Sequence, residues 1–591
     1  MDCLMIFNHL NDLIFTKHNA IFEEHIKNLA LAQGLILKEQ LEETLDSNVF
    51  IQLFSPIVSS HRIMHFQFGN SYTTIQFHTD FKLQFREFMD YVFIVISGEK
   101  VAYLIDMFVT FARYLCGPEI YQLRTNNCKS TLYTRLIDQW LLLRNRDQAV
   151  FVEGLEQLII NNDISATCLQ SLKESIAKLS VHPECSKIHA LLFVDNKCLS
   201  LYSSTPAKEL APADILFLII LTHCVSEESG HLESFQVLLS GSDVEPKCLP
   251  HAVHVVELFP QVFLVYLVEM GDPLVSATLF ETFHHLHRLR FIQVQREMAS
   301  IQMGYENVDL SIRKLNGYLK KCKVKNLESS QKQLIKKWDV LKGKYREYLK
   351  TLSNEALLRA ESLAMNLLDS LKEIHNLTAV DDSILKCSAA HVLQAIPKVR
   401  QDLADFNEYF LVKGIKNFSL GSEDSLTKHK YLEEFPGLVH FLYIDRNTHK
   451  VTTPSLDMQA EKAEFIQKKI WSMVTFAHSH LQEGHTAIIW KDTIFTYGYF
   501  LWFEDSSGDS LKFTLTPDLG SKIPGILHED YYMKLKTAMH PKLPAQKVRA
   551  YELFVMYLGL VTASSVLEQT RKLASTIWEL KSLPTHVINL I

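Results

Sequence analysis

The clearest pattern of hydrophobic and polar positions lies in the last third of the chain. The apolar run Leu438–Ile444 is followed by the polar turn Asp445–Asn447 and by a second run that ends at Thr453. Two such runs joined by a short polar turn predict a β-hairpin. The segment 460–481 then carries apolar residues at helical spacing, namely Ile466, Ile470, Met473, Ala477 and Leu481. This spacing predicts an amphipathic helix after the hairpin.

Three further apolar runs and two helical patterns complete this unit. The runs predict strands at Thr486–Trp490, Thr493–Glu504 and Leu511–Thr516. The helical patterns cover Asp530–Met539 and Gln546–Trp578. The predicted order is therefore a hairpin, a helix, three strands and closing helices.

The same order of elements precedes it in the middle of the chain. There the pattern predicts a hairpin, a helix that begins at a proline, three strands and a closing helix: Ile188–Val194 with Cys198–Ser203, Pro212 onward, Phe235–Leu239, Ala252–Leu258, Val262–Glu269, and Pro273 to about Met298. Because the residues differ while the order is kept, the chain reads as repeated small α/β units.

The N-terminal part follows the same order less clearly. Its predicted elements are a hairpin, a helix, three strands and two helices: Cys3–Phe7 with Leu13–Lys17, Ala20 onward, Arg62–Phe68, Thr73–His78, Tyr91–Ile96, Val101–Leu115 and Leu132–Ile160. Between the second and third units, amphipathic segments from Val308 to Val412 predict a helical region.

Composition places the chain among ordinary globular proteins. Its 591 residues carry a formal net charge of −7, which implies no bulk binding of polyanions. Ten scattered cysteines without a CxxC pair indicate the reduced thiols of a cytosolic protein. The N-terminus lacks a basic leader, and no apolar run reaches the length of about 20 residues that spans a bilayer. We therefore expect a soluble, cytoplasmic protein whose membrane contacts are peripheral.

The helical region is locally basic. Between Arg313 and Lys350 there are thirteen basic residues and three acidic ones, which gives a local charge of +10. Three interpretations stay open, namely a contact with anionic lipid, a contact with an acidic partner subunit, and a solvated helix face. We expect no nucleic-acid partner, because no aromatic-interleaved binding module accompanies these charges.

No pattern of enzymatic chemistry is present. The phosphate-binding loop, the dinucleotide fingerprint, the nucleophile elbow and the HExxH zinc motif are absent from the sequence. Histidine pairs at metal-ligand spacing occur, but no further ligand completes a set: His251 and His254, His284 and His287, His478 and His480. We therefore expect no catalytic residue, no cofactor and no bound metal.

Four segments carry a resemblance to a known family: Tyr431–Leu456 (YLEEFPGLVHFLYIDRNTHKVTTPSL), Tyr499–Glu504, Asp530–Tyr532 and Arg549–Leu553. They resemble the C-terminal part of the tri-longin family that includes the Hermansky–Pudlak syndrome 1 protein, a subunit of biogenesis of lysosome-related organelles complex three. The resemblance implies an α/β chain of the α+β type, in which each longin domain is a five-stranded, mainly antiparallel sheet flanked by helices.

The domain boundaries combine this resemblance with the pattern. We expect longin domains at 1–165, 185–300 and 430–591, with a helical, basic linker region at 305–415.

The resemblance also implies a function. The family member is one subunit of a heterodimeric guanine-nucleotide exchange factor for Rab GTPases of the thirty-two/thirty-eight subfamily, with the Hermansky–Pudlak syndrome 4 protein as its partner. The complex acts in the biogenesis of lysosome-related organelles such as melanosomes and dense granules, on endosomal or organelle membranes. The segment 1–160 is expected to face the Rab, although no Rab-binding residue can be assigned. The alternative is a non-catalytic adaptor or tether that binds GTP-loaded Rab.

Overall fold

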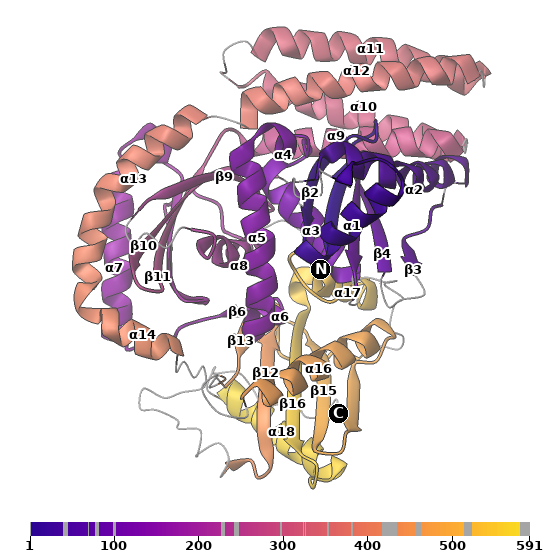
Figure 1. Ribbon diagram of the computed structural model, residues 1–591. Helices are drawn as coiled ribbons and strands as arrows, with labels where there is room; N and C mark the ends of the chain where they lie inside the picture. The colour runs from indigo at the N-terminus through magenta and orange to yellow at the C-terminus, as the bar shows by residue number, and fades with distance from the viewer. Residues whose placement is uncertain are drawn as a thin grey trace. The chain divides into compact units, whose positions relative to one another are not determined.

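The computed structural model describes most of the chain (Figure 1). The described residues are 2–38, 45–68, 70–76, 82–98, 102–225, 231–241, 248–295, 298–322, 324, 327–351, 354–379, 382–415, 434–454, 456, 463–512 and 523–579. They form two compact units, one made of Met1–Asp138, Phe235–Val253 and Glu269–Ser388, and the other of the remaining segments.

The first sheet has five antiparallel strands in the order β2-β1-β5-β4-β3. The strands are β1 (Cys3–Phe7), β2 (Leu13–His18), β3 (Thr74–Gln76), β4 (Lys82–Phe88) and β5 (Tyr91–Ser97). Helices α1 (Ala20–Ala32) and α2 (Ser47–Phe68) bury apolar side chains against one face of this sheet. They are followed by α3 (Ala102–Cys116), which contacts β4 and β5, and by α4 (Gln122–Thr125), α5 (Asn127–Arg146) and α6 (Gln148–Phe151).

The N-terminal predictions are confirmed in part. The hairpin, β5 and α3 lie where the pattern placed them, but the predicted strand Arg62–Phe68 is wrong because these residues end helix α2. Strand β4 was not predicted. The predicted strand Thr73–His78 contains β3, and its last two residues lie outside the described residues. The predicted helix Leu132–Ile160 is interrupted at Asp147, whose side chain accepts a hydrogen bond from the Val150 amide and caps α6.

The second sheet repeats the strand order of the first, as β8-β7-β11-β10-β9. Its strands are β7 (Ile188–Val194), β8 (Lys197–Ser203), β9 (Glu233–Leu239), β10 (Leu249–Phe259) and β11 (Val262–Glu269), and each predicted strand of this unit is confirmed. Helix α8 (Pro212–Thr222) begins at the predicted proline. Helix α7 (Asn162–Leu179), which was not predicted, contacts β7 and β8, and a short 3-10 helix η2 (Pro183–Cys185) precedes β7.

The third sheet has six strands in the order β14-β15-β16-β12-β13-β6. They are β12 (Leu438–Asp445), β13 (Lys450–Thr452), β14 (Ala487–Lys491), β15 (Phe495–Glu504), β16 (Arg549–Leu558) and β6 (Leu155–Glu156). Helices α16 (Ala463–Gln482) and α17 (Tyr531–Met539) cover one face, and α18 (Ala563–Glu579) covers the other. A short 3-10 helix, η4 (Ala545–Lys547), leads into β16.

The predicted helix Gln546–Trp578 is wrong in its first half, which forms the central strand β16. Almost every residue of β16 is buried, because alternate side chains face two different helical layers. A strand covered on both faces shows no alternation of apolar and polar residues, so its period is not visible in the sequence. The predicted strand Leu511–Thr516 lies mostly outside the described residues.

Strand β6 comes from the segment that follows α6, far from the other strands of the third sheet in the sequence. It pairs in parallel with β13, with Leu155 opposite Lys450. The next residue, Gln157, forms a parallel bridge to Cys198 of β8. The segment 155–157 therefore pairs with β8 of the second sheet and with β13 of the third, and its strand β6 forms the edge of the third sheet.

The predicted helical region is confirmed. It contains α9 (Pro273–Gln295), α10 (Met298–Leu319), α11 (Leu327–Thr351), α12 (Asn354–Ala379), α13 (Asp382–Leu403), η3 (Ala404–Phe406) and α14 (Asn407–Ile415). Figure 1 shows α9, α10, α11 and α12 as a layer of stacked helices, in which α9 packs on α10 and α12, and α11 packs on α10 and α12. No helix in the described part of the chain is long and apolar enough to cross a membrane.

We expect Gly154→Ala to destabilise the third sheet. A Cβ at Gly154 would lie 2.2 Å from Cγ2 of Val451 and 3.1 Å from the carbonyl oxygen of His449, so β6 has to move away from β13. Overpacking of this kind costs about 1–3 kcal/mol. The measurement is the urea midpoint of unfolding followed by intrinsic fluorescence.

The matched control is Gly343→Ala in α11, where an added Cβ meets nothing within 4 Å. This change should be neutral or stabilising by up to about 1 kcal/mol, because alanine favours a helix over glycine. Equal midpoints for Gly154→Ala and the unmodified chain would contradict the close packing of β6 on β13.

Candidate functional site

The basic residues of α11 fall into two groups that its packing separates. One face of the helix is buried and carries Leu334, Trp338, Leu341 and Tyr345. Basic residues beside this face bind neighbouring helices, whereas those on the opposite face are exposed.

Two lysines beside the buried face bind α10 and α12. Lys342 forms an ion pair of 2.6 Å with Asp309 of α10, which also accepts a hydrogen bond of 3.0 Å from the indole of Trp338. Burial raises the pKa of Asp309, but these two donors outweigh it and hold the pKa below its ordinary value. Lys337 donates to the Ser370 hydroxyl at 2.6 Å and to the Asn366 carbonyl at 3.0 Å on α12. These lysines hold the helices together.

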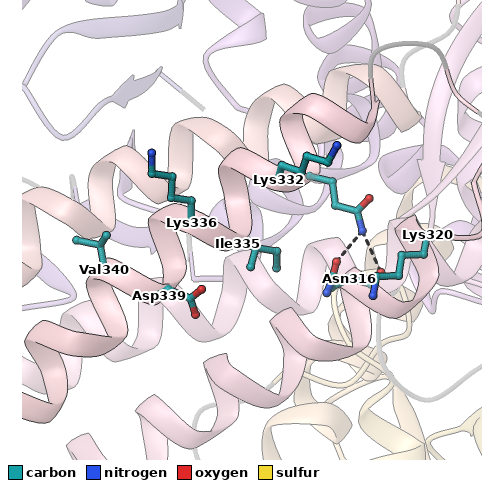
Figure 2. Close-up of a pocket in the computed structure, with 8 residues that line it drawn as sticks. Asn316, Lys320, Lys332, Ile335, Lys336, Asp339 and Val340 are labelled. Atoms are coloured by element: carbon teal, nitrogen blue, oxygen red, sulfur yellow. Dashed lines mark hydrogen bonds between the residues drawn. The ribbon is translucent and has the colours of Figure 1, made fainter.

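The exposed lysines surround an open groove between α10 and α11, which we call the lysine groove. It has a volume of about 640 Å³ and is lined by Lys320, which directly follows α10, and by Lys332, Ile335 and Lys336 of α11, together with Asn316, Gln331, Asp339 and Val340. In Figure 2 the amino groups of Lys332 and Lys336 lie on the same side of α11, and the carboxylate of Asp339 lies away from them.

The end of the lysine groove is rigid. The amide of Gln331 donates to the carbonyl oxygen of Asn316 at 3.2 Å and to its side-chain oxygen at 2.6 Å, which ties α10 to α11 (Figure 2). Among the described residues, the ammonium groups of Lys320, Lys332 and Lys336 have no ion pair or hydrogen bond. With three lysines and one aspartate, the groove carries a charge of +2 and can attract an anionic group. Lys323 and Lys325 lie outside the described residues.

A second polar feature lies inside the third module, the unit built on the third sheet. The guanidinium of Arg446 and the carboxylate of Glu552 are fully buried and form an ion pair of 2.6 Å. Burial of the carboxylate raises its pKa, but the charge of Arg446 and the nearby His478 outweigh this effect and lower the pKa of Glu552 to about 2. The pair therefore stays ionised within the apolar layer between the sheet and its helices.

Three more side chains complete the partners of this pair. The hydroxyls of Tyr499 and Tyr532 donate to Glu552 at 2.9 and 3.1 Å, and His478 lies 3.4 Å from the same carboxylate. Arg446 also lies over the ring of Tyr532, with its guanidinium carbon 4.0 Å from the ring centre. Such partners replace the water that a buried ion pair loses.

The ion pair also binds the segment that leads into β6. Arg446 donates to the carbonyl oxygen of Val152 at 3.1 Å. The buried carboxylate of the next residue, Glu153, accepts hydrogen bonds from the backbone amides of Ile526 at 2.5 Å and Leu527 at 2.8 Å. This network therefore holds the residues before β6 against the third module, and its role is structural.

Several histidines of the three pairs contact other groups. His478 approaches Glu552, His287 lies 3.2 Å from Asp90, and His251 bonds the carbonyl oxygen of Leu249. Within the described ranges, no group of three or more histidine, cysteine or carboxylate side chains comes together as metal ligands.

Comparison with protein families follows the same three-part division. The model of the first longin domain of FUZ, MON1 and HPS1 matches residues 2–143, that of the second matches 185–286, and that of the third matches 437–581. The chain belongs to this tri-longin family. Its fold class is thereby confirmed as three longin domains with mainly antiparallel sheets flanked by helices. The family is associated with Rab exchange or trafficking roles.

Sequence reasoning located the basic residues of this tri-longin protein but missed its buried ion pair. Arg446 was predicted only as a turn residue, and Glu552 was placed in a helix. The one signal was a carboxylate within the apolar run that follows Arg549. An isolated carboxylate in such a run predicts a buried partner of opposite charge, because an unpaired buried charge is strongly unfavourable.

We expect Arg446→Met to destabilise the third module by about 3–5 kcal/mol, because it leaves Glu552 buried without its counter-charge. The control is Lys468→Met, which removes an exposed ion pair with Glu464 and should leave stability unchanged. Unfolding in urea measures both. A change in Arg446→Met no larger than in the control would contradict the burial of this pair.

We also expect three buried histidines to lower stability as the pH falls from about 6.5 to about 4. Burial lowers the pKa of His61, His254 and His375 from 6.5 to about 4, so in this window the unfolded chain binds protons that the folded chain does not bind. Burial raises the pKa of Glu87 and Glu504 to about 7, which acts in the opposite direction, so the contribution of a histidine is measured by its own variant. His375→Gln should therefore reduce the dependence of the urea midpoint on pH. His25→Gln, at an exposed position, should leave it unchanged. Identical pH dependence in the two variants would contradict this assignment.

Proposed function

We propose that this chain is one subunit of a heterodimeric guanine-nucleotide exchange factor. The complex promotes GDP release from Rab GTPases of the thirty-two/thirty-eight subfamily and acts in the biogenesis of lysosome-related organelles. The observation that carries the proposal is the succession of three longin domains in the order of the FUZ, MON1 and HPS1 family. The resemblance of Tyr431–Leu456 to the Hermansky–Pudlak syndrome 1 protein supports the choice within this family.

An exchange factor of this kind changes no covalent bond. It binds the GTPase most tightly when the nucleotide is absent, and this differential affinity accelerates GDP release. The proposal therefore requires a docking surface and no catalytic residue or cofactor. The first longin domain, which the resemblance assigns to the Rab, offers exposed apolar side chains on α1 and α2, at Ile21, Ile63 and Phe68.

The proposed partner subunit is the Hermansky–Pudlak syndrome 4 protein. Strand addition is a physical route for such pairing, because an outer strand presents backbone groups that bind another extended chain. In the third sheet the outer side of β13 is occupied by β6, whereas β14 ends the sheet on its other side among the described strands. The pattern of occupied edges thus favours β14 over β13 as a pairing edge within this domain.

The proposed place of action is the cytoplasmic surface of endosomal or lysosome-related organelle membranes, reached by peripheral contact. The exposed basic residues of the helical layer support this part of the proposal, because positive charge is attracted to anionic lipid surfaces.

We expect release of fluorescent GDP from the Rab to accelerate when this chain is co-expressed with the proposed partner, and not with either subunit alone. Ile21→Asp on α1 should slow the exchange about tenfold, the loss typical of an apolar interface residue. Leu560→Asp, an exposed substitution in the third longin domain, is the matched control and should not slow it.

Two results would contradict the proposal. Unchanged GDP release with the pair, together with tight binding of GTP-loaded Rab, would identify an adaptor or tether instead. Equal exchange by Ile21→Asp and Leu560→Asp would remove α1 of the first longin domain from the Rab-binding surface.

A further inference from the structure

The lysine groove is positively charged, whereas Lys342 in the same helical layer is paired with Asp309 of α10. The ammonium groups of Lys320, Lys332 and Lys336 are exposed and have no ion pair or hydrogen bond among the described residues. An anionic ligand would lower the repulsion among these like charges. The groove is therefore an unoccupied binding surface rather than part of the packing.

The types of residue in the groove favour phosphate over carboxylate as the anionic group. All three of its basic residues are lysines, which act as point charges toward phosphate, whereas planar carboxylates are recognised best by arginine. An acidic amphipathic helix would also need apolar anchors over several turns. The groove has only two aliphatic side chains, Ile335 and Val340, and Val340 is half exposed. This floor is too short to hold such a helix.

The groove is open to solvent and large enough to admit a small headgroup. A volume of about 640 Å³ lies within the range of small-ligand sites. Its lysines come from two segments, with Lys320 in the turn after α10 and Lys332 and Lys336 on α11. The bonds between Gln331 and Asn316 hold these walls together before any ligand binds.

We propose that the lysine groove binds the phosphorylated inositol headgroup of a membrane phosphoinositide. Lys320, Lys332 and Lys336 contact the phosphate groups, and Ile335 and Val340 lie against the ring. This inference deepens the peripheral membrane contact of the proposed function. It does not require exchange activity, so the two can fail separately.

The test is co-flotation of the full-length chain with phosphatidylcholine vesicles that contain either phosphatidylinositol bisphosphate or phosphatidylserine at equal total surface charge. The variant is Lys320→Gln/Lys332→Gln/Lys336→Gln. The matched control is Lys314→Gln/Arg346→Gln/Lys350→Gln, which removes the same charge at exposed positions of α10 and α11 outside the groove. Circular dichroism checks that both variants keep their helices.

We expect the unmodified chain to prefer the phosphoinositide vesicles. The groove variant should bind these vesicles at least about tenfold more weakly, whereas the control should lose only a small part of its binding. A soluble inositol polyphosphate should compete for the same site. GDP release measured in solution, without vesicles, should be the same for the groove variant and the unmodified pair, which separates this inference from the proposed function.

Three outcomes would overturn the inference. Equal binding to both kinds of vesicle, reduced equally by both triple variants, would show a general attraction of charges. Tight binding of the soluble inositol polyphosphate without binding to vesicles would assign the site to a soluble ligand. Loss of the co-expressed partner subunit from the groove variant, with vesicle binding retained, would make the groove a protein interface.

Discussion

The third longin domain depends on an ion pair that has no contact with water. Moving a guanidinium and a carboxylate into an apolar layer costs several kcal/mol per ion, and only excellent geometry with further hydrogen bonds offsets this cost. Here Arg446 and Glu552 lie 2.6 Å apart, and Tyr499, Tyr532 and His478 surround the carboxylate. Because each member would be an uncompensated buried charge without the other, strands β12 and β16 are held in one register.

The same ion pair also binds a segment that lies almost 300 residues before Arg446 in the sequence. Arg446 binds the carbonyl oxygen of Val152, and this contact places the following residues as strand β6 beside β13. Two further hydrogen bonds hold the residues before β6 on the third domain. The indole of Trp471 donates to the carbonyl oxygen of Arg144, and the side-chain amide of Gln467 donates to the carbonyl oxygen of Asn145. An edge that would otherwise be open to another chain is thereby covered by this chain itself.

The helical layer shows how packing assigns different roles to residues of one kind. Lysines beside the buried face of α11 are held by Asp309 and Ser370 and stabilise the layer. Lysines on the outer face, such as Lys332 and Lys336, are exposed. In the function that we propose, the longin domains dock the GTPase and the partner subunit, and the helical layer contacts the membrane.

Local patterns in the sequence were sufficient for many elements of this fold. The hairpins Cys3–His18, Ile188–Ser203 and Leu438–Thr452 were predicted because each joins two apolar runs by a short polar turn, which is information held within about 20 residues. The apolar run Thr493–Glu504 likewise predicted a strand, which β15 confirms, and helices cover both of its faces.

Other features were decided only by the tertiary structure. Strand β16 shows no alternation, because helices cover both of its faces, and β6 is too short to have a period at all. The local sequence pattern predicts Arg446 only as a polar turn residue. Its burial depends on the carboxylate of Glu552, which lies 106 positions further along the chain. The sequence determined that the linker carries an excess of positive charge. Only the packing of α11 against its neighbours determined which lysines bind other helices and which line the groove. The reason is that the partners of each lysine depend on the face of the helix on which it lies.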